Sequence, residues 1–311
     1  MPKEYFYPPH KRASVLVICL WAIMILSILG IGLTSLVFQE IKFARTYRRQ
    51  VISLPMARSA LRAVFYLREK DPTPSYDTAA ELAEENRLEF CSGNYAAYYF
   101  VDKVNSEAED KVIDEGALIN LNSASTDILK RLPGIDEELA DNIANSGVRP
   151  FRSINEVLLV EGMTKETFLL FKDLVTVYGT GRININTASK EVLLALGLDE
   201  ELAEVIIRFR REHIIEPPED SLPEGSLPED PLELEPEYGI SDLNNLLADL
   251  RSFAFLGLRQ EQDILSLLPV FSVSSEYLRF NIIPGFGGDK GVHYSIVIHP
   301  GTRKIISWNE T

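Results

Sequence analysis

The chain has 311 residues, 46% of them hydrophobic, which is enough for one large or two modest domains with their own cores. Its formal net charge of −15 disfavours nucleic-acid binding except through a local basic patch, because phosphate backbones repel an acidic surface. The two cysteines and four histidines form neither metal-ligand spacing nor a disulfide framework, and no nucleophile–base set points to an enzyme.

Residues 14–38 are predicted to form a transmembrane helix. The run from Ala13 to Phe38 carries no charge and exceeds the roughly 20 residues that cross a bilayer. A cleaved secretory signal is the alternative, but its apolar region is shorter and ends at a small-residue site, which this run lacks. Lys11 and Arg12 place the N-terminus in the cytoplasm, although the basic residues of 42–49 argue weakly for the opposite orientation.

Helical character is predicted to continue past the membrane to about Glu69, because apolar residues recur at helical spacing and no glycine interrupts them. This plan resembles type IV pilins, in which a membrane helix continues into an amphipathic helix that supports a globular head. In the span, Ile18, Ala22, Gly30 and Gly32 are predicted to pack against neighbouring spans in a fibre. Ordinary tolerance of small residues in a membrane helix is the alternative.

The residues around Ala13 resemble the leader junction of pilin-like proteins, where a prepilin peptidase cuts between a small residue and the apolar helix. Cleavage is therefore predicted between Ala13 and Ser14, with residues 1–13 as a cytoplasmic leader, although Ala13 stands where that family usually has Gly. Ile18 then becomes the fifth mature residue, where most pilins have Glu. That carboxylate neutralises the terminal amine of a neighbouring subunit, so a subunit lacking it suits the fibre tip.

Residues 119–264 are predicted to form an inserted all-helical domain with a duplicated module. The stretches Ile119–Ser125 (INLNSAS) and Ile183–Ser189 (ININTAS) each precede a helix. Deleting Pro133 then aligns the two following segments, Leu132–Ala140 and Leu196–Ala203.

Each module has the signals of a helix-hairpin-helix. Ser125 and Ser189 are expected as helix N-caps, and Gly134 and Gly197 permit the tight turn between two helices. After each hairpin a further similar segment follows: Arg152–Leu158 resembles Tyr238–Leu243.

The hairpins are predicted to be architectural. A DNA-binding hairpin offers free backbone N–H groups at a helix start, usually through a Gly-hydrophobic-Gly turn with bases nearby. Here Asp136 and Asp199 replace the second Gly, and Arg208, Arg210 and Arg211 lie about three turns away. The alternative is a membrane-anchored, competence-type DNA receptor, which also places such hairpins after one membrane span.

Residues 216–237 are rich in acids and prolines and contain no base. Such a segment cannot bury enough apolar area to order itself, so it is predicted to be a mobile loop. Calcium binding by its carboxylates is the alternative, without EF-hand spacing to support it.

Residues 39–118 and 265–311 are predicted to form an α/β head, with an antiparallel sheet lying on the N-terminal helix. The fold class is therefore α+β: a type IV pilin-like fold with a large inserted all-α domain of duplicated helix-hairpin-helix (SAM-like) modules. Strands are predicted at Ala96–Val104, Ala117–Leu121, Val270–Ser274, Leu278–Ile283, His293–His299 and Lys304–Trp308.

In this order, these features resemble one family, the type II secretion system minor pseudopilin K (general secretion pathway protein K). The resemblance covers nearly the whole chain and rests on Ser14–Ala22, Asp114-Glu115 before Ile119–Asn122, Ile183–Ala188, Val270–Ser275 and Ile305–Trp308.

The resemblance implies a non-enzymatic subunit at the tip of a periplasmic pseudopilus, anchored by one span in the inner membrane with its C-terminal domain in the periplasm. The implied partners are minor pseudopilins I and J, other pseudopilins, prepilin peptidase and the inner-membrane assembly platform. Some members bind calcium in the head, so calcium is the one cofactor that the resemblance suggests, with its ligands unknown.

Overall fold

The computed structural model describes residues 11–69, 71, 73–79, 82, 89–92, 95–98, 113–215, 238–282, 285–286, 289–290 and 292–310. The chain divides into two compact units, Met1–Leu54 and Pro55–Thr311. The helices are α1 (Lys11–Glu69), the 3-10 helix η2 (Glu115–Ala117), α3 (Thr126–Leu129), α4 (Glu137–Ala144), η3 (Ile154–Leu159), α5 (Lys165–Phe171), η4 (Lys172–Leu174), α6 (Lys190–Leu196), α7 (Glu200–Glu212), α8 (Leu246–Phe253) and α9 (Leu258–Leu267). The strands are β1 (Glu89–Ser92), β2 (Tyr95–Tyr98), β3 (Ile113–Asp114), β4 (Ile119–Asn120), β5 (Val175–Thr176), β6 (Ile183–Asn184), β7 (Phe271–Ser272), β8 (Leu278–Ile282), β9 (Gly285–Phe286), β10 (Asp289–Lys290), β11 (Tyr294–His299) and β12 (Lys304–Glu310).

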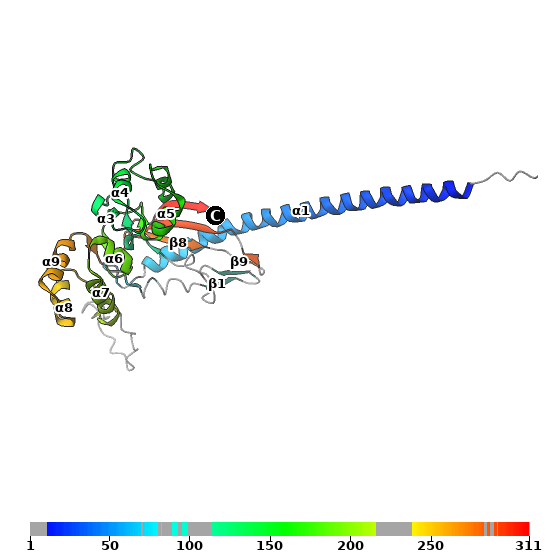
Figure 1. The fold of residues 1–311 in the computed structure, drawn as a ribbon. Helices are drawn as coiled ribbons and strands as arrows, with labels where there is room; N and C mark the ends of the chain where they lie inside the picture. The colour runs from blue at the N-terminus through cyan, green and yellow to red at the C-terminus, as the bar shows by residue number, and fades with distance from the viewer. Residues whose placement is uncertain are drawn as a thin grey trace, which may run out of the picture. The chain divides into compact units, whose positions relative to one another are not determined.

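The first unit consists of the N-terminal part of α1. This helix ends at Glu69, as the sequence predicts, and Pro55 lies inside it (Figure 1). Val15–Tyr47 is long and apolar enough to cross a membrane, with a mean hydropathy of 2.8 in its most apolar window. Its large apolar side chains are exposed, as a membrane-facing helix requires.

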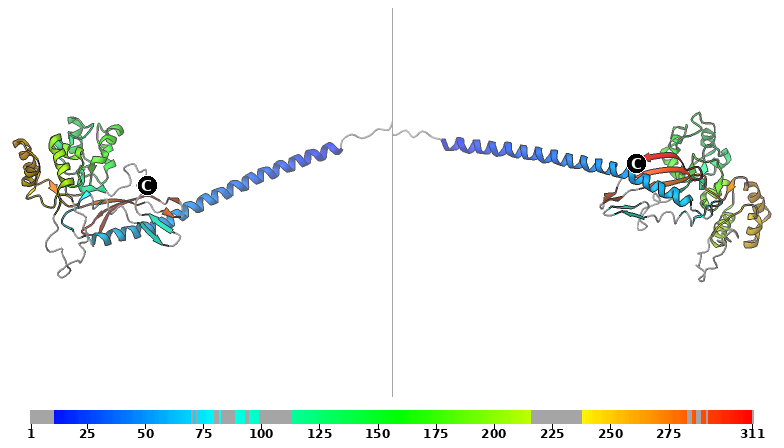
Figure 2. Two further views of the ribbon diagram at one scale, coloured as in Figure 1. Left: turned by 90° about the horizontal axis from the view of Figure 1, so that it is seen from below. Right: turned by 180° about the vertical axis from the view of Figure 1, so that it is seen from behind.

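The head is built on a four-stranded antiparallel sheet in the order β12-β11-β8-β3. Alternate residues of β8 (Leu278, Phe280, Ile282) and of β11 (Ile296, Ile298) are fully buried, so they form one core-facing side of the sheet. Asn281 and Val297, which lie between them, are also buried. The part of α1 after Pro55 runs along this sheet (Figures 1 and 2). Its buried residues are Ala57, Ala60, Leu61 and Val64. Their three- and four-residue spacing gives one apolar helix face.

Two modules of similar plan make up the helical region. Each begins with a two-residue strand and ends with another that pairs parallel to it, β4 with β5 and β6 with β7. The helices between them share one hydrophobic core, in which Leu121, Phe171, Ile185 and Phe271 are fully buried. The duplicated unit is therefore larger than one hairpin. In the described residues, α3, α4, η3, α5 and η4 lie between β4 and β5, and α6, α7, α8 and α9 lie between β6 and β7.

Several sequence-based boundaries change. Ala117–Leu121 is the end of η2 followed by β4 rather than one strand. Val270–Ser274 does not join the head sheet, because β7 pairs with β6 and Phe271 belongs to the helical core. The boundary set at residue 264 falls inside α9. β2 covers the start of the predicted strand Ala96–Val104, and its remainder and the loop 216–237 lie outside the described residues.

Candidate functional site: the paired hairpins and their junction with the head

The first hairpin forms as its sequence predicts. The Ser125 hydroxyl accepts a bond from the backbone N–H of Ile128 and caps α3. Gly134 has φ +77°, a left-handed conformation that suits glycine at the turn into α4. The Asp136 carboxylate then caps α4 by accepting a bond of 2.9 Å from Leu139 N.

The second hairpin repeats this geometry. Ser189 caps α6 through Val192 N, and Gly197 ends α6 with φ +107°. The Asp199 carboxylate caps α7 by accepting a bond of 2.8 Å from Leu202 N. At the start of the second helix of each hairpin, an Asp side chain therefore occupies the position where a DNA-binding hairpin would hold a phosphate.

An asparagine holds each hairpin to the next part of its module. The Asn122 side chain accepts a bond from Phe151 N at 2.7 Å and donates one to Phe151 O at 2.9 Å. Asn186 makes the same pair of bonds with Ile240, each of 2.8 Å. These contacts correct the alignment of Arg152–Leu158 with Tyr238–Leu243, which paired Ile240 with Ile154. In the structure, Ile240 corresponds to Phe151.

Two of the three arginines that could have supported DNA binding, Arg208 and Arg210, make contacts within the fold, whereas Arg211 is exposed. Arg210 donates to the carbonyl oxygens of Ile185 at 2.7 Å and Ala188 at 2.8 Å, and burial lowers its pKa to about 10. Arg149 makes the equivalent contact in the first module, donating to Ala124 O at 3.1 Å. Arg208 lies over the ring of Phe253.

The hairpin lysines form ion pairs with acids of the following helix. Lys130 lies 2.6 Å from a Glu137 oxygen, and Lys190 lies 2.7 Å from Glu200 and 2.6 Å from Glu204. Each of these lysines therefore has a carboxylate partner on the surface of its hairpin.

A buried acidic cluster joins the second module to the head. Asp114, at the end of β3, accepts a bond from Gly116 N through one carboxylate oxygen. Its other oxygen accepts bonds from Ser275 Oγ at 2.6 Å, Thr187 Oγ1 at 2.5 Å and Asn184 Nδ2 at 3.0 Å. One carboxylate thus ties the head sheet to the first turn of the second module and to the segment that returns from it.

Two further acids extend this junction. Glu115 pairs with Arg279 of β8 at 2.5 Å and accepts a bond from the Thr176 hydroxyl. Asp77 pairs with Arg68 of α1 at 2.5 Å and accepts a bond from Ser275 N. The cluster therefore connects α1, the head sheet and both helical modules.

Burial raises the pKa of Asp114, against the lowering effect of its bonds from Ser275, Thr187 and Gly116. Burial likewise raises the pKa of Glu115, against the lowering effect of Arg279. In the described part of the chain, no Lys or Arg forms an ion pair with Asp114. Within the described residues, the hydrogen bonds that offset the loss of water around the Asp114 carboxylate therefore come from neutral groups, although Asp114 is only 4% exposed.

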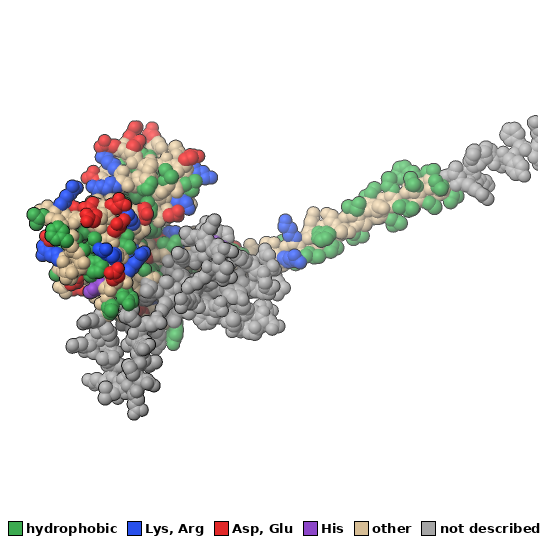
Figure 3. Space-filling view, turned by 60° about the horizontal axis from the view of Figure 1, so that its bottom comes forward, with side chains coloured by type: hydrophobic (Ala, Val, Ile, Leu, Met, Phe, Trp, Pro, Cys, Tyr) green, Lys and Arg blue, Asp and Glu red, His purple; other side chains and the backbone are tan. Residues whose placement is uncertain are grey.

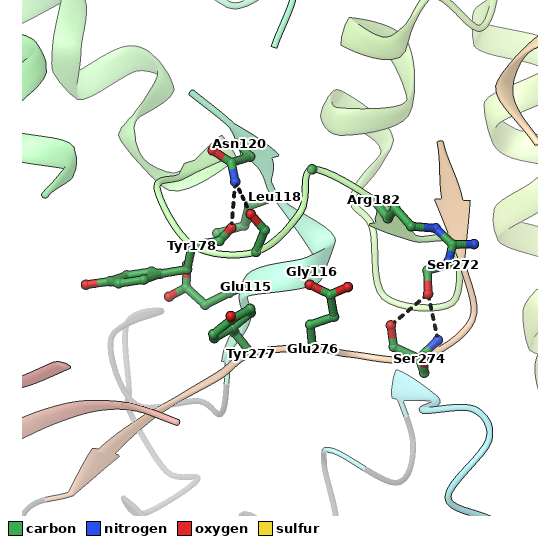
Figure 4. Close-up of a pocket in the computed structure, with 12 residues that line it drawn as sticks. Glu115, Gly116, Leu118, Asn120, Tyr178, Arg182, Ser272, Ser274, Glu276 and Tyr277 are labelled. Atoms are coloured by element: carbon green, nitrogen blue, oxygen red, sulfur yellow. Dashed lines mark hydrogen bonds between the residues drawn. The ribbon is translucent and has the colours of Figure 1, made fainter. Parts of the chain in front are cut away.

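A small polar cavity of about 10 Å³ lies beside this cluster, between η2, the linker of the two modules and residues 272–277 (Figure 4). Asn120 donates to the carbonyl oxygens of Tyr178 and Gly179 along one wall. On the other side, Glu276 accepts bonds from Thr180 N and Thr180 Oγ1. This cavity has room for about one water molecule.

No group of three or more His, Cys, Asp or Glu side chains suited to a metal occurs within the described ranges, and the acidic loop lies outside them. The proposed leader residues Ala13 and Ser14 lie in the first turns of α1. Ile18, Ala22, Gly30 and Gly32 are exposed on the same helix, and the space beside each glycine is open to 4 Å.

Sequence reasoning missed the role of the junction. The Asp114-Glu115 pair is visible in the sequence, but paired acids alone carry little information. Its partners Asp77, Asn184 and Ser275 are far away in the chain. The local signal that could have pointed to it is the position of two acids directly before the first module.

Comparison with known proteins agrees with this architecture. Residues 114–176 match the family model described as a helix-hairpin-helix motif. A search of curated proteins finds no match. Among solved structures, the chain is similar to one in the crystal structure of the GspK-GspI-GspJ complex from the enterotoxigenic Escherichia coli type 2 secretion system. The identity is 15% and the TM-score 0.55, and the match covers 88% of this chain and 99% of that chain. The chain therefore has the fold of that solved chain, and it combines an apolar N-terminal helix, an antiparallel sheet and an inserted helical hairpin domain.

Proposed function

We propose that this protein is a minor pseudopilin of the type II secretion system, in the role of subunit K. The observation that carries the proposal is that a solved chain of the GspK-GspI-GspJ complex aligns over 99% of its length with this chain. The alignment therefore extends beyond a helical hairpin or a membrane helix alone. The order of features along the sequence resembles the K family and supports the same assignment.

The proposed role is to cap or initiate the pseudopilus tip together with minor pseudopilins I and J. A head enlarged by two helical modules would collide with its neighbours inside a close-packed fibre, whereas a cap has free space above it. The buried junction at Asp114 and Glu115 supports this role, because it fixes the second module to the head sheet. No step of this role needs catalysis, since the tip acts by assembly to drive export of folded proteins across the outer membrane.

In this proposal α1 anchors the chain in the inner membrane, with the C-terminal domain in the periplasm. Prepilin peptidase would cut between Ala13 and Ser14, and Ile18, Ala22, Gly30 and Gly32 would pack against neighbouring spans in the fibre. The head comprises residues 39–118 and the C-terminal strands. We extend the inserted helical domain to residues 119–273, because Val273 still packs against the helical core.

The proposal is tested by deleting the gene from its own bacterium and measuring secreted proteins in the medium. Loss of secretion, restored by the wild-type gene, is expected. Unchanged secretion together with lost DNA uptake would support the competence-type receptor instead. In the strain complemented with the wild-type gene, mass spectrometry should find a mature N-terminus at Ser14, and an intact Met1 would contradict processing by prepilin peptidase.

A salt-dependent DNA titration of the purified protein separates the two functions directly. Both hairpins have an Asp cap at the anion position and lysines paired with acids. We therefore expect no duplex binding beyond a weak background at physiological salt. Tight binding that weakens steeply with salt would show that phosphates are neutralised by this surface, and would contradict the architectural role of the hairpins.

A further inference from the structure

A basic segment follows the apolar span directly. Four of the eight residues from Lys42 to Arg49 are Lys or Arg, and the nearest acid before them is Glu40. Lys42 and Arg45 are exposed. Figure 3 shows Lys and Arg side chains gathered on α1 next to its apolar stretch. The protein as a whole has a net charge of −15, so this local excess of positive charge is unusual within it.

The length of the span places this segment at the membrane surface. Val15–Phe38 measures about 36 Å at 1.5 Å per residue, somewhat more than the hydrocarbon core of about 30 Å. Lys42 follows Phe38 by about 6 Å along the helix. With the hydrocarbon core on Val15–Phe38, Lys42–Arg49 therefore lies in the headgroup layer on the side of the head, within reach of phosphates.

The distribution of side chains around the helix favours lipid over one protein neighbour. Lys42 and Arg45 are three positions apart, so they share one helix face. Phe43 and Tyr47, four apart, lie on a different face and are 74% and 62% exposed. A single protein partner would cover one face, whereas a headgroup layer surrounds the helix and accepts both cations and amphipathic rings.

We propose that Lys42 and Arg45 bind anionic phospholipid headgroups in the leaflet on the side of the head, with Phe43 and Tyr47 at the same level. The attraction is between the side-chain cations and lipids that carry a net negative charge. This contact fixes the depth of the span. Because both leaflets contain phospholipid, this lipid contact would give the basic residues after the span the same role on either side of the membrane.

The test uses the full chain in detergent, titrated with phosphatidylglycerol or with phosphatidylcholine of the same acyl chains, and bound lipid is counted by native mass spectrometry. The variant K42Q/R45Q removes two of the cations. The matched control R58Q/R62Q removes two exposed arginines of the same helix beyond the proposed headgroup layer. Circular dichroism verifies that both variants keep the helix.

We expect the wild type and R58Q/R62Q to prefer phosphatidylglycerol to a similar extent. In K42Q/R45Q its apparent affinity should fall about 30-fold, from about 1 kcal/mol for each of two cations, while phosphatidylcholine binding stays unchanged. Equal binding of both lipids by the wild type would overturn the proposal. An equal loss in the control would also overturn it, because the effect would then follow total charge. The proposal would also be overturned if K42Q/R45Q kept its preference for phosphatidylglycerol but bound other pseudopilins more weakly. The segment would then be a protein-binding surface.

Discussion

Replacing Asn186 with Ala should destabilise the helical domain through one identifiable contact. The side chain accepts from Ile240 N and donates to Ile240 O, each at 2.8 Å, and Asn186 and Ile240 are only 2% and 3% exposed. The substitution leaves both backbone groups of Ile240 buried without their partner. At about 1–3 kcal/mol for each of the two unsatisfied groups, the free energy of unfolding should fall by about 2–6 kcal/mol.

The assay is urea unfolding of a fragment of residues 40–311, followed by circular dichroism and compared at the transition midpoint. Asn122→Ala should have a similar effect, because Asn122 makes the same pair of bonds with Phe151. Asn145→Ala is the matched control, since Asn145 is exposed and its side chain bonds only one nearby carbonyl. If Asn186→Ala lowers stability no more than Asn145→Ala, the asparagine contacts do not hold the modules together.

Three further perturbations probe the junction, the turns and the interior. Burial raises the pKa of Asp114 and Glu115, so the folded state binds a proton at each group more tightly than the unfolded state does. The stability that this proton binding contributes is fully present below the ordinary pKa of each group and is lost as the pH rises through its raised pKa. The wild type should therefore gain stability relative to Asp114→Asn on acidification from neutral pH, and a pH-independent difference would contradict this. Gly197→Ala should lower stability by about 1–2 kcal/mol in thermal unfolding, because φ is +107° there, whereas Gly147→Ala, in open space, should change it little. Arg210→Met should lower the urea midpoint by removing two bonds to buried carbonyl oxygens, and an unchanged midpoint would show that water replaces the guanidinium.

Local sequence signals predicted the elements that depend on near neighbours. The N-caps at Ser125 and Ser189 and the glycine turns at Gly134 and Gly197 are confirmed, because each is decided by residues within a few positions. The apolar period of α1 and the alternation in the C-terminal strands likewise reflect local burial. The placement of Asp199 as a cap, which closes the anion position, could also be anticipated from the residue type alone.

Contacts between distant segments could not be predicted in the same way. Val270–Ser274 reads as a strand, but nothing near it in the chain shows that its partner is Ile183–Asn184 rather than the head sheet. The junction at Asp114 depends on hydroxyl and amide groups from segments that only the tertiary fold brings together. Serine, threonine and asparagine are common in loops, so their convergence on one carboxylate leaves no sequence signal.

The central claim is that this head assembles with minor pseudopilins I and J. The most direct measurement mixes the fragment of residues 40–311, which retains the compact unit Pro55–Thr311, with the soluble heads of pseudopilins I and J encoded in the same genome. The mixture is then weighed by light scattering after gel filtration. We predict a single species whose mass equals one copy of each subunit. If the fragment elutes as a monomer apart from both partners at concentrations where they form their own complex, the proposed tip role is wrong.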